Sequence, residues 1–289
     1  MTVTDSAGAL IEPRLAAHTG YLARLAFLRL NEADLAALPA GRSPRDLAIL
    51  GVLADRPLSQ AALGQLLDVN RTVMISVIDG LEGAELVRRE RDAADRRRYA
   101  LAVTTGGRAA LSSMRASVEA AETALAAPLG AGGRDRLNAL LGRIVPDVTA
   151  ELPEAFAGWT GHLADRAAQR LRARREESLR GLGLEPRCVR MLMTLESAQP
   201  CTQERLAAGM GVTAPTIVQA IDDYHSAGLI LRDRNPADRR EHVLRLSPRG
   251  DDYLAQALAA EDGAQRDLAG GLGRAGTAEL NALLTALIG

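Results

Sequence analysis

Several residue types that usually mark a class of protein are scarce in this sequence of 289 residues. Aromatic residues make up only 2% of it while alanine and leucine abound, a composition that suits helices better than sheets. Two cysteines, Cys188 and Cys201, are too few for a disulfide framework or a zinc site. No apolar run approaches the roughly 20 residues of a membrane span, and the N-terminus lacks the pattern of a secretion signal. These absences predict a mainly α-helical, cytoplasmic protein that does not enter membranes.

Lysine is missing altogether, so all 35 basic residues are arginines. The simplest explanation is a GC-rich bacterial genome, because arginine codons are rich in G and C and lysine codons are not. The net charge of −1 gives no global indication of nucleic-acid binding. Every cation nevertheless has a planar guanidinium group, which suits phosphates and base edges. The distribution of arginine is therefore more informative than its total.

The chain contains an internal repeat. The segment 19–23 recurs at 160–164, and from residue 57 onward the spacing settles at 143. Within that stretch Ala-Asp-Arg-Arg at 94–97 recurs at 237–240, and Leu-Asn-Ala-Leu-Leu at 137–141 recurs at 280–284. A constant register over more than eighty residues indicates two copies of one domain. We predict domains at 1–146 and 147–289.

Local signals predict the same elements in each copy. A long first helix is expected at about 19–38, and at about 153–180 in the second copy. Ser43, Ser59 and Asn70 are typical N-caps of three following helices, and Thr202 and Thr213 take the last two of these places in the second copy. Alternating residues from 86 to 103 then predict a β-hairpin with its tip at 92–97, followed by two end helices.

A short helix, a turn, a second helix and a hairpin with a basic tip form the pattern of a winged helix-turn-helix. The wing sequence Asp92-Ala93-Ala94-Asp95-Arg96-Arg97, followed by Val-Thr-Thr-Gly-Gly, resembles that of the multiple-antibiotic-resistance regulator (MarR) family, and 235–240 repeats it. The resemblance covers nearly the whole chain. It implies two winged helix-turn-helix domains, mainly α with small β-wings, whose long end helices form a pseudo-twofold core like that of a MarR dimer.

The family resemblance implies a transcription regulator, usually a repressor, that a small phenolic or apolar ligand releases from DNA. Because the chain is a tandem fusion, we expect an intramolecular pseudo-dimer on an imperfect inverted repeat of double-stranded DNA, with further oligomerisation left open. The alternative is a winged-helix protein-interaction module, or anti-regulator, that has lost DNA binding. The sequence shows no catalytic arrangement, no metal site and no cofactor site, and the Gly-x-Gly-x-x-Gly spacing at 271–276 is interpreted as a turn between helices.

The residues expected to contact DNA lie in the recognition helices and the wings. Arg71 is suited to guanine and Gln219 to adenine, whereas the alternative is a solvated helix surface. Those of the recognition helices are Asn70, Arg71, Thr72, Ile75 and Ser76 in the first copy, and Thr213, Ala214, Pro215, Thr216 and Gln219 in the second. Those of the wings are Arg91, Asp95, Arg96 and Arg97, and Arg234, Asp238, Arg239 and Arg240. In the family an aspartate near the tip orients the arginine, a role that matches Asp95 and Asp238.

Ligand-contacting residues are predicted from the first helix of each copy, where the family binds its ligands. His18, Tyr21, Phe27, Trp159 and His162 could hold a phenolic or carboxylate ligand in a cavity lined by leucine and alanine. Packing between the end helices is the alternative interpretation of the same residues. The two cysteines are expected to be buried and inert. Glycine supplies a left-handed turn at low cost, and Glu85 stands where the second copy has Gly228, so we expect the first recognition helix to end by means other than a left-handed turn.

Overall fold

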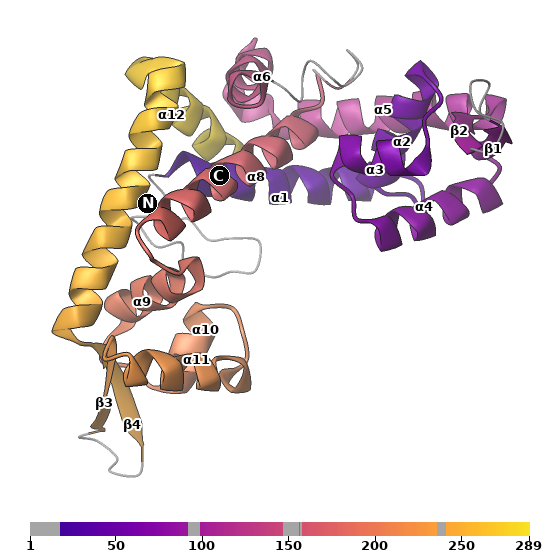
Figure 1. The fold of residues 1–289 in the computed structure, drawn as a ribbon. Helices are drawn as coiled ribbons and strands as arrows, with labels where there is room; N and C mark the ends of the chain where they lie inside the picture. The colour runs from indigo at the N-terminus through magenta and orange to yellow at the C-terminus, as the bar shows by residue number, and fades with distance from the viewer. Residues whose placement is uncertain (1–17, 92–98, 147–155, 157, 236–240) are drawn as a thin grey trace. The chain divides into compact units, whose positions relative to one another are not determined.

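A computed structural model of the chain describes residues 18–91, 99–146, 156, 158–235 and 241–289 (Figure 1). Its elements are helices with two small antiparallel hairpins. The first copy contains α1 (Thr19–Ala37), α2 (Pro44–Asp55), α3 (Gln60–Leu67), α4 (Arg71–Gly83), β1 (Val87–Arg91), β2 (Tyr99–Val103), α5 (Thr105–Leu125), a 3₁₀ turn (Ala127–Leu129) and α6 (Gly133–Ile144). The second contains α8 (Thr160–Gly181), α9 (Pro186–Ala198), α10 (Gln203–Gly209), α11 (Ala214–Ser226), β3 (Ile230–Arg234), β4 (His242–Leu246) and α12 (Pro248–Ile288).

The predicted repeat is confirmed element by element. Val87 pairs with Val103 in the first hairpin, and Ile230 with Leu246 in the second, each 143 positions later. A bridge from Leu58 to Leu101 likewise recurs from Cys201 to Leu244. The run of α12 is interrupted at Gly273, whose φ of 77° matches the 73° of Gly130, so both copies break the chain between their two end helices at the same place. The glycine-rich 271–276 segment is thus a helix break, as predicted.

Side-chain caps account for where the helices of the winged domains begin. Ser43 accepts from the backbone of Asp46, whose carboxylate in turn accepts from the backbone N–H of Ser43 at 2.8 Å, a complete capping box. Ser59 caps α3 and Asn70 caps α4 by the same kind of bond. One predicted boundary was wrong: the helix expected from about residue 153 begins at Thr160 as α8.

The recognition helix α4 ends on a left-handed residue that is not glycine. Glu85 has a φ of 59°. Its backbone N–H donates to the carbonyl of Glu82, and the backbone N–H of Leu86 donates to the carbonyl of Leu81. Gly228, with φ of 72°, occupies the same place after α11. The expectation that the first copy ends its helix by other means was therefore wrong, because Glu85 adopts the conformation that glycine favours.

We expect the substitution Glu85→Gly to raise the free energy of unfolding by about 1 kcal/mol, because a side chain in the left-handed region costs roughly 1–2 kcal/mol and Glu85 is exposed. Gly228→Glu should lower it by a similar amount. Urea denaturation followed by circular dichroism measures both. Equal stability of both variants and the parent chain would contradict the assigned strain.

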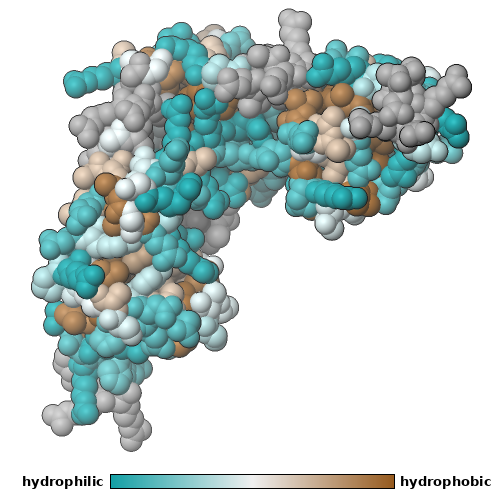
Figure 2. Space-filling model, in the orientation of Figure 1, coloured by the Kyte–Doolittle hydropathy of each residue, from teal (hydrophilic) through white to brown (hydrophobic). Residues whose placement is uncertain are grey.

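Each winged domain has its own hydrophobic core. In the first, Leu63, Met74 and Ile78 are completely or almost completely buried between the helix-turn-helix and α2. In the second, the equivalent Leu206, Ile217 and Ile221 are buried in the same way. Figure 2 shows mainly hydrophilic side chains over both winged domains on the visible face, with hydrophobic ones in small, separate patches.

The structure divides into two compact units, and each unit includes the beginning of the first helix of the other copy. One unit comprises Ala23–Ala168 with Ala282–Gly289, and so includes the start of α8 from the second copy. The other comprises Gln169–Asn281 with the described part of Met1–Leu22, and so includes the start of α1 from the first. In this second unit Thr19 donates to the Asn281 side chain at 2.7 Å. Neither compact unit consists of one repeat alone.

In the described part of the chain, no single helix is long and apolar enough to cross a membrane. The pair α3 and α4 passes that test of length and composition only when taken together, and the two helices are bent by 115° at the break between them. An angle of this size is that of a helix-turn-helix.

Candidate DNA interface and ligand cavity

The first recognition helix, α4, has one buried and one exposed face. Met74 and Ile78 are buried in the core, while Arg71, Thr72, Ile75 and Ser76 are all exposed. Within the described residues, the Arg71 guanidinium has no hydrogen-bond or ion-pair partner. Asn70 is exposed too, although its carbonyl Oδ1 accepts from the backbone N–H of Val73 as the cap of α4. Arg71 is therefore the cation of this helix that is available for a ligand.

The second recognition helix, α11, has a different exposed surface. Pro215, Thr216 and Gln219 are exposed, and Ala214 is half-buried. The Gln219 amide donates to Asp223 at 2.9 Å, one turn further along the helix. The Thr213 hydroxyl contacts that of Thr216 at 2.8 Å, and it makes no capping bond to the backbone. The polar groups of Thr216 and Gln219 are thus paired along the helix itself.

One exposed apolar position is common to both recognition helices, and sequence reasoning identified only half of it. Ile75 is 41% exposed, and Val218, which stands 143 positions later, is 40% exposed. An apolar side chain at such a position can contact the methyl group of thymine. Val218 therefore belongs to the candidate surface, and the repeat register would have been enough to find it.

An arginine in each wing holds the hairpin against the recognition helix. Arg89 bonds Asp79 at 2.9 Å and Glu82 at 3.0 Å, and Arg232 pairs with Asp222 in the second copy. These arginines act as struts between strand and helix. Arg91 and Arg234, at the ends of β1 and β3, are exposed. The predicted tip residues Asp95, Arg96, Arg97, Asp238, Arg239 and Arg240 lie outside the described residues.

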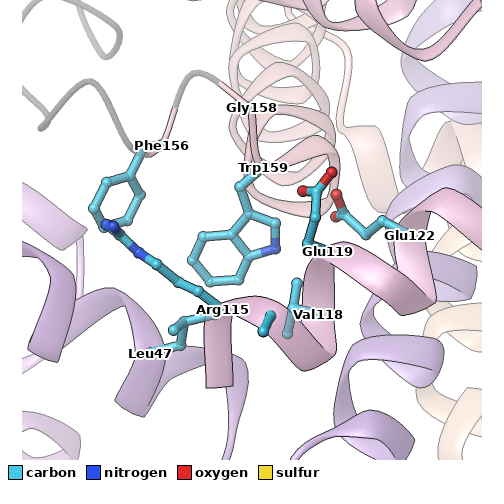
Figure 3. A pocket seen from close by; sticks show the side chains of 9 residues that line it. Leu47, Arg115, Val118, Glu119, Glu122, Phe156, Gly158 and Trp159 are labelled. Atoms are coloured by element: carbon cyan, nitrogen blue, oxygen red, sulfur yellow. The ribbon is translucent and has the colours of Figure 1, made fainter. Parts of the chain in front are cut away.

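A cavity of about 330 Å³ lies beside α5 in the first compact unit. Leu47, Val118, Phe156 and Trp159 supply much of its apolar lining, and Arg115, Glu119 and Glu122 supply charge. Figure 3 shows the Arg115 side chain reaching toward the Phe156 ring, whereas the two glutamates lie on the other side of Trp159. No hydrogen-bond or ion-pair partner for Arg115 exists among the described residues.

One of the five predicted ligand residues lines this cavity, and a second packs against it. Trp159 lines it, and the His162 ring stacks on Trp159 with the ring centroids 5.5 Å apart. Phe156, which sequence reasoning missed, completes the cluster at 5.2 Å from His162. Burial lowers the pKa of His162 to about 4, so its ring is neutral.

The other three predicted ligand residues do not line this cavity. Phe27 lies elsewhere on α1, where the Arg24 guanidinium covers its ring at 5.2 Å. His18 and Tyr21 belong to the other compact unit. Both are half-buried there.

Arg134 is the centre of a polar network behind the cavity. Its guanidinium bonds both carboxylate oxygens of Glu119, at 2.6 and 2.8 Å, and one of Glu122 at 2.9 Å. It also donates to the carbonyl of Gly158 and, through Nε, to the hydroxyl of Thr160. The Glu122 side chain is completely buried and that of Arg134 is 15% exposed, so this is a largely desolvated ion pair.

Glu122 also holds the beginning of α8. Its carboxylate accepts from the backbone N–H groups of Thr160 at 3.0 Å and Gly161 at 2.6 Å, where an anion is favoured by the unpaired donors of a helix N-terminus. A Cβ atom on Gly161 would lie 3.0 Å from Asp34 Oδ2 and 3.1 Å from Glu122 Oε1. Glycine is therefore needed where the two carboxyl groups approach the backbone.

Asp34 is the second buried acid of this centre. Its side chain is 1% exposed, Oδ2 accepts from the Trp159 indole at 3.0 Å, and Oδ1 has no partner within the described residues. Burial, together with the nearby Glu122, raises the pKa of Asp34 to about 7. Burial also raises the pKa of Glu122, against the opposing effect of its backbone donors and Arg134.

The two cysteines are buried, as predicted. Burial and the neighbouring Glu185 raise the pKa of the Cys188 thiol to about 12, and burial raises that of Cys201. A thiol that stays protonated is a poor nucleophile. The structure thus gives no support to a redox-sensing role.

Comparison with known proteins gives a consistent result for both copies. The family model described as MarR family matches residues 40–98 and again 182–241. A Thauera aromatica protein, named as the candidate transcriptional regulatory protein for the hcr operon, is 35% identical over 83 residues, which is 28% of this chain. The chain spans about half the length of that curated relative.

Solved structures with a similar fold include a transcriptional repressor, CouR, bound to a 23-mer DNA duplex, at 28% identity and a TM-score of 0.39. Another is a candidate transcriptional regulator from Pseudomonas aeruginosa, at 30% identity and a TM-score of 0.37. Each alignment covers 43% of this chain, and 89% and 93% of the respective neighbour. The two family matches fall on equivalent parts of the two copies, each from the region before the helix-turn-helix into the wing. The chain carries the domain of the MarR family twice, once in each copy.

Proposed function

We propose that this chain regulates transcription by binding double-stranded DNA with both of its winged domains. The observation that carries the proposal is the repeated arrangement of an exposed recognition helix with an arginine strut to its wing, Arg89 to Asp79 and Arg232 to Asp222. A wing fixed at its base can present basic residues to the groove beside the one that the helix enters. The arginines at the wing tips, Arg97 and Arg240 among them, stay predicted minor-groove contacts.

The single chain acts, in this proposal, as a pseudo-dimer. Support comes from the exchange of first-helix starts between the compact units, with Thr160 held by Arg134 in one unit and Thr19 held by Asn281 in the other. Thr19 and Thr160 are equivalent residues of the repeat, so the exchange is reciprocal. An isologous dimer makes reciprocal contacts of this kind between its two subunits.

The regulator is a repressor that leaves its DNA when the cavity beside α5 is filled. The cavity combines the aromatic rings of Phe156 and Trp159 with Arg115, which has no partner in the described part of the chain, so the ligand that fits it best is an aromatic acid. Glu119 and Glu122 do not oppose this choice, because both are bonded to Arg134. A small-molecule site of about 300–1,000 Å³ with few polar groups is typical, and this cavity lies at the lower end.

A protein-interaction module without DNA binding is the alternative. The arginines at 71, 91 and 234 are exposed and have no partner within the described ranges. They favour DNA, because a protein-binding surface depends more on apolar anchors than on isolated cations. The first experiment is a gel shift with the DNA that flanks the gene of this protein. Absence of any shift at low salt, on that DNA and on random duplexes, would favour the interaction module.

We expect the preferred DNA site to be an imperfect inverted repeat, because the two recognition helices differ at equivalent positions of the repeat. Arg71 corresponds to Ala214, and Ser76 corresponds to Gln219. Arg71→Ala should lose about tenfold or more in discrimination at a guanine of one half-site only. In the wild type, the Gln219 amide has to give up its bond to Asp223 in order to bind a base. Gln219→Ala should therefore reduce discrimination at an adenine of the other half-site. Random-site selection followed by sequencing gives the consensus and the effect of each variant.

Arg274→Ala serves as the control, because Arg274 is an exposed arginine outside both winged domains. It should leave the consensus and the affinity unchanged. A strictly palindromic consensus, or equal losses in both half-sites from Arg71→Ala, would show that the two helices read DNA alike.

A further inference from the structure

The cavity beside α5 is lined by residues of the first copy and by Phe156 and Trp159, which lead into the first helix of the second, and the repeat does not contain a second set of them. With the spacing of 143 that holds for the end helices, Arg115 corresponds to Leu258 and Glu122 to Gln265. With the spacing of 141 that holds for the first helix, Trp159 corresponds to His18. By the same two spacings, Arg134 corresponds to Thr277, Phe156 to Leu15 and Asp34 to Arg175. The aromatic rings of Phe156 and Trp159 and the charges of Arg115, Glu122 and Arg134 therefore do not recur in the repeat, whereas the acid of Glu119 recurs as Asp262.

The described counterparts in the second copy have other roles. Leu258 is half-buried and packs against the hydrophobic core of its own winged domain. The Thr277 hydroxyl donates to the carbonyl of Gly273 at 3.1 Å, one turn back along α12. The start of α1 is held by a direct bond from Thr19 to Asn281. At the equivalent start of α8, Thr160 is instead bonded by Arg134 and Glu122. The described counterparts thus serve packing and local bonds at places where the first copy builds a charged centre.

We infer that the chain has a single effector site, the cavity beside α5, and that it takes one aromatic acid per chain. This inference rests on the proposed function and adds to it that ligand sensing is asymmetric, although DNA reading uses both copies. The acid group binds the Arg115 guanidinium, and the ring lies against Phe156 and Trp159. The acid thus stays on the side of Trp159 that is away from the two glutamates.

The position of the site explains how one ligand could act on both copies. Trp159 immediately precedes α8, the first helix of the second copy, and Glu122 and Arg134 of the first copy bond the opening residues of α8. A ligand that moves Trp159 changes the bond from its indole to Asp34 and the backbone that leads into α8. The junction between the copies is therefore part of the wall of the cavity.

The test counts bound ligands and locates them in one titration. Trp159 is the sole tryptophan of the sequence, so its fluorescence reports on this cavity alone. We use 1-naphthoate as the probe, and record isothermal titration calorimetry and tryptophan fluorescence on the full chain. One equivalent of probe should account for all the binding heat and for the whole fluorescence change.

The matched variants are Arg115→Leu, which installs the residue found at position 258, and Arg108→Leu, which removes another exposed arginine of α5. Arg115→Leu should weaken naphthoate binding at least tenfold, because the acid loses its charged partner. Arg108→Leu should bind as the wild type does. Circular dichroism and thermal unfolding of both variants verify that they fold.

Several results would overturn the inference. A second equivalent of probe that binds with heat but without a fluorescence change would place another site in the second copy. One equivalent that leaves Trp159 unchanged and tolerates Arg115→Leu would place the site elsewhere. Binding of 1-naphthylmethylammonium in place of naphthoate would show that the site selects cations. The gel shift of the unliganded protein stays independent of all three, so a failure of DNA binding is recognised separately.

Discussion

Replacing Arg134 by methionine is expected to lower the free energy of unfolding by about 3–5 kcal/mol. Glu122 is completely buried, and removal of its cationic partner leaves an uncompensated charge in the interior. The loss also removes the bonds from Arg134 to the Gly158 carbonyl and the Thr160 hydroxyl, which tie the start of α8 to the first copy. Chemical denaturation followed by Trp159 fluorescence measures the effect in the unit that contains this centre.

A double variant separates the buried charge from simple loss of packing. Glu122→Gln with Arg134→Met removes both charges, while the amide oxygen can still accept from one of the two backbone N–H groups, that of Thr160 or that of Gly161. It should therefore be more stable than Arg134→Met alone by 1 kcal/mol or more. Glu119→Gln is the control, because the Glu119 side chain is 64% exposed and an exposed ion pair contributes up to about 1 kcal/mol. A loss from Arg134→Met no larger than that of Glu119→Gln would refute the role of burial.

Asp34→Asn should become progressively more stable than the wild type as the pH rises from about 4 to about 7. The pKa of Asp34 is raised from 3.8 to about 7 in the folded chain, so between these values the folded state binds a proton that the unfolded state has released. The contribution of this proton to stability is complete below pH 4 and is lost as the pH rises through 7. Asparagine resembles the protonated acid and has no such loss. The stability difference should grow by about 1 kcal/mol per pH unit.

The protonation of His162 changes the stability with pH in the opposite direction, and it masks the effect of Asp34 in the pH profile of the wild type. The pKa of His162 is lowered from 6.5 to about 4, so stability is lost as the pH falls through that range. The comparison must therefore be the difference between Asp34→Asn and wild type at each pH, and His162→Phe should give a difference of opposite slope. Glu32→Gln, an exposed acid on the same helix, is the control and should give a flat difference. A flat difference for Asp34→Asn as well would show that this carboxyl is solvated.

Much of the local structure followed from the sequence because its causes act over three or four residues. Ser43 and Asp46 predict the start of α2, as Asn70 does for α4, since a cap bonds donors within the same turn. The end of α4 was the instructive failure. Local preference argues against a left-handed glutamate, but the chain must enter β1 at this point, and Glu85 adopts the strained conformation.

The sequence by itself determined the repeat, the order of elements in each copy, the buried and exposed faces of the recognition helices and the family. Each of these depends on periodicity, caps or motifs, which a linear pattern carries directly. Only the tertiary structure decided that Arg134 meets Glu119, Glu122, Gly158 and Thr160. It also decided that Arg115 lies near Phe156 and has no carboxylate partner among the residues that the structure describes. In the sequence, Arg134 and Glu122 look like ordinary surface charges of the end helices. They are buried only because distant segments of the chain pack over them. Desolvation and charge pairing depend on which segments meet in space, and the sequence pattern of a single helix does not contain that information.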